Sequence, residues 1–174
     1  MVFVLMGVSG CGKSTIGRML AHELQIPFYD ADDFHSRENI RKMSAGHPLT
    51  DEDRYPWMMV LAEKIAAWSR EGDAVLACSA IKEMYRETLS SEGKALFIYL
   101  KGDKVLILSR IMMRENHFMP AKLLNSQFHD LEEPTDAITV PIDAPPTDVV
   151  SMIICELLKR GLVAEKAAAG HHER

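Results

Sequence analysis

Short, continuously apolar segments alternate along this chain with longer segments in which apolar residues recur every three or four positions. The short runs are typical of strands buried on both faces, and the longer pattern is typical of helices with one buried face. Strands are therefore predicted at residues 2–6, 27–29, 74–78, 95–100 and 138–142. Because the two kinds of segment alternate, we expect an α/β fold with three layers, in which helices cover both faces of a five-stranded parallel sheet.

Turn and capping residues limit the helices between these strands. A helix over residues 36–45 is expected to stop at Gly46, and a longer helix is expected to follow Pro56. Ser79 is the expected N-cap of the next helix, and residues 147–148 are expected to cap the last one.

Residues 103–133, which we call the lid region, contain two further expected helices joined around residues 116–120. This pair follows the fourth predicted strand and is the best candidate for a segment that closes over bound substrates. Pro141 lies inside the fifth predicted strand and lacks a backbone donor, so that strand is expected at an edge of the sheet.

Composition narrows the class of protein. The chain has 174 residues, 47% of them hydrophobic and 26% charged, so we expect a single domain over residues 1–161 and a flexible tail over residues 162–174. The net charge of −5 argues against a dedicated nucleic-acid binder. Neither a membrane-spanning run nor a signal-peptide pattern is found, and the three cysteines form no paired motif, so a cytoplasmic protein without a membrane partner is expected.

The clearest chemical signal is the segment Gly-Val-Ser-Gly-Cys-Gly-Lys-Ser at residues 7–14, which fits the phosphate-loop pattern between a strand and a helix. Its glycines let backbone N–H groups converge on phosphate oxygens at the start of the helix. Lys13 supplies positive charge to the β- and γ-phosphates, and the Ser14 hydroxyl is a magnesium ligand, so ATP and Mg²⁺ are the expected cofactors. The residues predicted to bind the nucleotide are Gly7, Val8, Ser9, Gly10, Cys11, Gly12, Lys13, Ser14, Thr15 and Arg110.

Two alternatives for the glycine-rich segment fit the sequence less well. A chance glycine-rich turn would not be expected to have a strand and a helix correctly placed on its two sides. A GTPase would carry an Asn-Lys-x-Asp segment late in the chain, and none is present. Kinases and other ATPases remain open on this motif alone.

An acidic pair follows the second predicted strand. Asp30 and Asp32 lie at its carboxyl end, the edge at which open parallel sheets bind ligands. A kinase needs one carboxylate near the magnesium ion and another that orients the attacking hydroxyl and accepts its proton. We assign Asp30 to the metal and Asp32 to the substrate. An acidic surface turn is the simpler alternative, which the neighbouring phosphate loop makes less favourable.

Basic residues near the same edge indicate the substrate class. Arg54, Lys82 and Arg86 are predicted to hold a small hydroxy acid by its carboxylate, which suits the planar guanidinium group. For each of them a surface salt bridge is an equally good interpretation.

The lid region and the acidic segment contribute further candidates. In the lid region, Arg110 and Arg114 lie on one helix face and are predicted to neutralise the transferring phosphate, unless they only form a solvated basic face. His117 and His35 are predicted to bond substrate hydroxyls, although lone histidines often have no such role.

These segments together resemble the bacterial gluconokinases. The similarity covers residues 4–159 and is most specific in the Asp-Arg-x-Pro-Trp segment at residues 53–57 and the His-Phe-Met-Pro segment at residues 117–120. It also includes Lys42 and Gln127, which the resemblance adds to the predicted substrate contacts. Ser36, Cys11 and residues 111–113 depart from the family's common pattern.

The resemblance implies a phosphate-loop kinase fold with strand order 2-3-1-4-5, a helical lid and a homodimer. It also implies that the chain is a gluconokinase, which transfers phosphate from ATP to the terminal hydroxyl of D-gluconate and makes 6-phospho-D-gluconate. The implied adenine position is near Arg110 and residues 143–146. A kinase of the same fold acting on another sugar acid, shikimate or a nucleotide is the alternative, and a nucleotide-dependent switch or interaction protein is the alternative from another class.

Overall fold

The computed structural model describes residues 1–113 and 121–164 and contains one parallel sheet with the strand order β2-β3-β1-β4-β5. This confirms the predicted fold and strand order. The strands are β1 (Val2–Met6), β2 (Phe28–Asp30), β3 (Ala74–Ala77), β4 (Ala95–Lys101) and β5 (Ile138–Pro141). All four neighbouring pairs are parallel, and the register places Leu5 of β1 beside Ala77 of β3 and Ile98 of β4.

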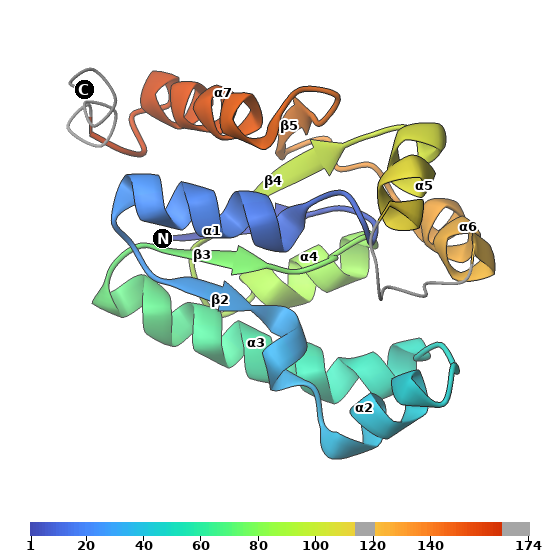
Figure 1. The fold of residues 1–174 in the computed structure, drawn as a ribbon. Coiled ribbons are helices and arrows are strands. Elements are labelled where there is room, and N and C mark those ends of the chain that lie inside the picture. The colour runs from blue at the N-terminus through green and yellow to red at the C-terminus, as the bar shows by residue number, and fades with distance from the viewer. Residues whose placement is uncertain (114–120, 165–174) are drawn as a thin grey trace.

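Helices cover both faces of this sheet (Figure 1). Helices α1 and α7 pack together on one face, and α3 and α4 pack together on the other. The lid-region helices α5 and α6 lie side by side beyond the end of β4, next to the loop between β1 and α1. The helices are α1 (Lys13–Leu24), α2 (Arg37–Ser44), α3 (Asp51–Glu71), α4 (Glu83–Ser90), α5 (Lys104–Met112), α6 (Ala121–Asp130) and α7 (Pro146–Lys159), with a 3₁₀ turn η1 (Ala31–Phe34).

The hydrophobic core follows the central strands. Every residue of β1 and of β3 is buried, which explains why these strands are continuously apolar in the sequence. The edge strand β5 alternates buried and exposed residues, and Pro141 is exposed at its end. The prediction that this proline marks an edge strand is therefore confirmed.

The start of α3 corrects one prediction. The helix begins at Asp51 rather than after Pro56, because Thr50 and Asp53 form a capping box. The Thr50 hydroxyl accepts from the Asp53 N–H at 3.2 Å, and the Asp53 carboxylate accepts from the Thr50 N–H at 2.7 Å. These bonds satisfy backbone donors at the helix start, and Pro56 lies inside the helix near its beginning.

Two other predicted helix starts are also wrong. Helix α4 begins at Glu83 rather than after Ser79, and its first N–H is accepted by the distant Glu132 carboxylate. Helix α7 begins at Pro146, because proline is favoured at the first helical position, and residues 147–148 lie within its first turn. No helix in the described part of the chain is long and apolar enough to cross a membrane.

Candidate active site

The phosphate loop lies between β1 and α1 with three glycines at positive φ. The values are 141° at Gly7, 85° at Gly10 and 100° at Gly12, a region that other residues rarely adopt. A Cβ atom at Gly10 would lie 2.7 Å from the Ile111 side chain of α5. No side chain of the described residues caps the start of α1, so its first N–H groups are free to bind an anion.

The two polar side chains that end the loop are held in different ways. The Lys13 ammonium donates to the carbonyl oxygens of Gly7 and Val8, both at 3.0 Å, and therefore lies over its own loop. The Ser14 hydroxyl donates to Asp30 Oδ2 at 2.7 Å. Asp30, the last residue of β2, therefore lies next to the end of the phosphate loop.

Ser14 and Asp30 form a donor set that fits Mg²⁺, which prefers oxygen ligands and is usually held by one or two protein groups together with phosphates. The described residues do not form a metal site from protein ligands alone. Among residues 1–113 and 121–164 no three His, Cys, Asp or Glu side chains gather in a way that could hold a metal.

Asp32 lies one residue into the 3₁₀ turn η1, beside Asp30. Its N–H donates to Asp30 Oδ1 at 3.2 Å, so the first carboxylate fixes the backbone of the second. Partial desolvation and, second, the like charge of Asp30 raise the pKa of Asp32 above its usual range. The Asp32 carboxylate itself is open to solvent, where a substrate hydroxyl can reach it.

His35 ends the same segment, and its side chain is only 5% exposed. Its Nε2 atom lies 3.8 Å from Asp32 Oδ1, and its ring stacks on Trp57. Burial lowers the pKa of His35, an effect that Asp32 opposes and the positive charge of Arg54 reinforces. This shift favours the uncharged form of the ring.

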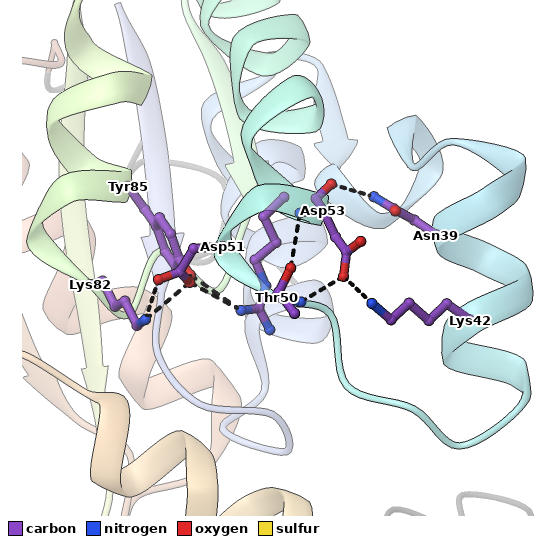
Figure 2. Close-up of polar contacts among 8 residues, drawn as sticks. Asn39, Lys42, Thr50, Asp51, Asp53, Lys82 and Tyr85 are labelled. Atoms are coloured by element: carbon purple, nitrogen blue, oxygen red, sulfur yellow. Dashed lines mark hydrogen bonds and ion pairs between the residues drawn. The ribbon is translucent and has the colours of Figure 1, made fainter.

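A charged network links the start of α3 to α4 (Figure 2). The Lys82 ammonium donates to both Asp51 oxygens, at 3.0 and 2.8 Å, and the Tyr85 hydroxyl donates to the same carboxylate. Arg54 donates to the Tyr85 oxygen at 3.2 Å and lies 3.8 Å from Asp51. Hydrogen bonds from Lys82 and Tyr85 lower the pKa of Asp51. The structure thus brings the predicted Arg54 and Lys82 together around an acidic residue that sequence reasoning had missed.

Lys42 has a separate partner. Its ammonium contacts the Asp53 carboxylate, and the buried Asn39 side chain donates to the Asp53 carbonyl at 2.9 Å (Figure 2). These contacts tie α2 to the start of α3, whose capping box the Thr50-x-x-Asp53 spacing could have located. In the structure, Lys42 therefore takes part in the contact between α2 and α3.

Arg86 and Arg110 are also held by the protein itself. Arg86 is buried and donates to the Ala80 carbonyl at 3.1 Å. Arg110 donates to the carbonyl of Ile142, the residue that follows β5. It borders a pocket of about 240 Å³ at the place where adenine is expected. The other residues lining this pocket include Gly12, Ile16, Ile142, Ala144 and Val149.

Gln127 of α6 contacts the phosphate loop. Its Oε1 accepts from the Ser9 N–H at 2.7 Å, and its Nε2 donates to the Ser9 hydroxyl at 3.2 Å. The predicted site residues Arg114 and His117 lie outside the described residues.

The chain is similar to known kinases over most of its length. The family model described as shikimate kinase matches residues 9–137, well over half of the chain. The thermoresistant gluconokinase of Escherichia coli (strain K12) is 43% identical over 92% of this chain and 94% of that protein. The chain belongs to the gluconokinase family. A probable gluconokinase of Rattus norvegicus is 40% identical over 91% of this chain and 97% of that protein.

The fold agrees with this assignment. The crystal structure of a gluconokinase from Sinorhizobium meliloti 1021 superposes with a TM-score of 0.84 at 36% identity, covering 98% of this chain and 97% of that one. The resemblance to gluconokinases in the sequence is therefore confirmed.

Proposed function

We propose that this chain is a gluconokinase that transfers the γ-phosphoryl group of ATP to the terminal hydroxyl of D-gluconate, giving ADP and 6-phospho-D-gluconate. The observation that carries the proposal is the pairing of Ser14 with Asp30 and the adjacent Asp32, in a chain 43% identical to a named gluconokinase. The phosphate loop and Ser14 form the side of the site that suits phosphate, and Asp32 presents an exposed carboxylate on the other side.

The phosphate loop binds the nucleotide. Its backbone N–H groups and the Lys13 ammonium neutralise the β- and γ-phosphates, and the adenine takes the pocket beside Arg110. Ser14 and Asp30 hold Mg²⁺, which neutralises charge on the phosphate oxygens when it is bound. In the lid region, Arg110 and Arg114 are proposed to add positive charge to the group in transfer.

Asp32 is the proposed general base. Its exposed carboxylate lies next to the metal side of the site, where a substrate hydroxyl can approach it and transfer a proton to it. As the hydroxyl oxygen bonds to the γ-phosphorus, the bond from phosphorus to the bridging oxygen of ADP breaks, and the hydroxyl proton passes to Asp32. Asp30 stays on the metal side and fixes the Asp32 backbone.

Arg54 and Lys82 are the proposed partners of the gluconate carboxylate. Asp51 and Tyr85 hold both cationic groups beside each other, so that they need little reorganisation when an anion arrives. Lys42, Arg86, His117 and Gln127 complete the proposed substrate set, whereas the buried His35 ring faces the site only through Asp32.

We further propose that residues 1–161 form a single domain whose lid region closes over substrates, and that the protein is a cytoplasmic homodimer. The predicted tail begins too early at residue 162, because Leu162 and Val163 pack against the hydrophobic core, and residues 165–174 lie outside the described residues. The free cysteines support a reducing compartment. Exposed apolar side chains on α3 and α4, such as Val60 and Met84, support a second copy packing against this face. Light scattering on the purified chain measures the oligomeric state.

One assay tests the activity. ADP release is measured with gluconate, idonate, shikimate and a set of nucleotides, with Asp32→Asn as a second enzyme. Gluconate should give the highest kcat/KM, and the variant should lose kcat by roughly a hundredfold or more while binding ATP normally. Shikimate is the second candidate, because the shikimate kinase model matches residues 9–137. A higher kcat/KM with shikimate would establish that alternative, and ADP release independent of any acceptor would indicate a nucleotide-dependent switch.

A further inference from the structure

Trp57 ends the Asp-Arg-x-Pro-Trp segment and has no part in the chemistry proposed above. It lies on α3 and is only 6% exposed. Its indole Nε1–H donates to the carbonyl of Ala31 at 2.9 Å in a buried hydrogen bond. Ala31 is the residue between Asp30 and Asp32, so Trp57 holds the backbone that carries both carboxylates.

The same indole also contacts His35, the residue that follows the turn carrying Asp32. The rings of His35 and Trp57 stack with centroids 4.1 Å apart and planes 18° apart. The indole thus contacts residues on both sides of Asp32, one through a hydrogen bond and the other through its ring face. Two fixed points four residues apart leave the turn between them little freedom.

His35 has an arrangement that packing alone does not explain. Its Nδ1 atom is buried without a hydrogen-bond partner among the described residues, and burying an unsatisfied polar group costs about 1–3 kcal/mol. A phenylalanine would make the same stack without this cost. The other ring nitrogen, Nε2, faces Asp32 Oδ1 at 3.8 Å, so the histidine is best explained by what it does to that carboxylate.

We propose that Trp57 and His35 are positioning residues for Asp32: Trp57 fixes the Ala31 backbone and the imidazole ring, and His35 Nε2–H directs the Asp32 carboxylate. This deepens the proposed function, because it rests on Asp32 as the base of the phosphoryl transfer. The side chain of His35 exposes too little surface to bind a sugar acid directly, which distinguishes positioning from substrate contact.

Kinetic variants separate the roles. His35→Phe keeps the stack and removes Nε2, while His35→Gln restores an N–H donor at a similar reach. Trp57→Phe keeps an aromatic ring and removes the bond to Ala31. The matched control is Trp68→Phe, because Trp68 is on the same helix and packs on Tyr29 and Phe34, on either side of the two carboxylates, whereas the hydrogen bond to Ala31 comes from Trp57.

His35→Phe and Trp57→Phe should lower kcat roughly ten- to hundredfold, as expected for a misplaced reacting group, with KM for gluconate and ATP nearly unchanged. His35→Gln should recover part of kcat, and Trp68→Phe should keep it even where the melting temperature falls equally. In the Asp32→Asn background, His35→Phe should cause almost no further loss, because His35 acts through Asp32. An increase in gluconate KM at constant kcat, additive losses in the double variant, or an unchanged kcat would each overturn the proposal.

A second measurement tests the role of His35 without an assay of kinase activity. Long-range ¹⁵N NMR of the imidazole in the wild-type protein should report the uncharged tautomer with the proton on Nε2. A proton on Nδ1 would overturn the proposal on His35. If the wild-type protein forms no gluconate-dependent ADP, gluconate phosphorylation is wrong, and the tautomer still decides whether His35 is oriented toward Asp32.

Discussion

Gln127 binds the backbone N–H and the side-chain hydroxyl of Ser9. Its Oε1 accepts from the Ser9 backbone N–H at 2.7 Å, and its Nε2 donates to the Ser9 hydroxyl at 3.2 Å. The two residues are 118 positions apart, so this pair joins helix α6 of the lid region to the phosphate loop. Ile111 of α5 packs against Gly10 of the same loop. Both described helices of the lid region therefore touch the nucleotide-binding loop directly.

We expect Gln127→Leu to weaken ATP binding. The substitution leaves the Ser9 N–H without its partner, so the loop is less well ordered before the nucleotide arrives, and the KM for ATP should rise roughly tenfold, equivalent to about 1.4 kcal/mol. Titration with ATP and steady-state kinetics measure the effect. Asn125→Leu, an exposed position on the same helix, is the control. A KM for ATP within twofold of wild type would mean that the contact has no role in nucleotide binding.

Lys13→Ala should lower turnover by orders of magnitude and change stability little. The ammonium bonds mainly to the carbonyls of Gly7 and Val8, so the fold loses few contacts, whereas the phosphates lose their point charge. Coupled ADP release and thermal melting measure the two effects. Arg18→Ala removes a cation from the same helix, where Arg18 lies over the Phe28 ring, and should keep full activity. Normal turnover in Lys13→Ala would contradict the proposed phosphate site.

Asp51 should make stability depend on pH. Its pKa is lowered in the folded state by Lys82 and Tyr85, so its contribution is fully present above the ordinary aspartate pKa of about 3.9 and is lost as pH falls through the folded value. Asp51→Asn should therefore have a lower urea midpoint than wild type at pH 7, with a gap that closes below about pH 4. Glu63→Gln, an exposed carboxylate on α3, is the control. A gap that stays constant down to the lowest pH would show that the charge of Asp51 does not stabilise the fold.

Gly17→Ala should destabilise the protein although alanine favours helices. A Cβ atom at this position on α1 would lie 2.6 Å from Phe28 and 3.5 Å from Val75. Overpacking of this kind typically costs about 1–3 kcal/mol, more than the gain of roughly 1 kcal/mol in helix propensity. Urea unfolding measures the difference. Gly72→Ala should be nearly neutral, because no atom of the described residues lies within 4 Å of the added atom, and equal stability for both variants would contradict the packing of α1 on β2.

The sequence by itself determined the features that depend on neighbouring residues. The five strands are visible as apolar runs, and the phosphate loop is visible because its glycines, Lys13 and Ser14 are contiguous. Asp30 is placed by the end of its strand. Helix starts were predicted less well where capping was decisive: Thr50 and Asp53 start α3 before Pro56, a pattern within reach of the sequence.

Only the tertiary structure decided how side chains from distant segments pair. Asp51 of α3 meets Lys82 at the start of α4, Trp57 of α3 meets Ala31 after β2, and Gln127 of α6 meets Ser9 of the phosphate loop. Hydrophobic periodicity specifies which face of a helix is buried, but it leaves open the position and rotation at which that helix packs on its neighbours. A polar contact forms within about 3 Å, so it depends on the packing that the local pattern leaves undetermined.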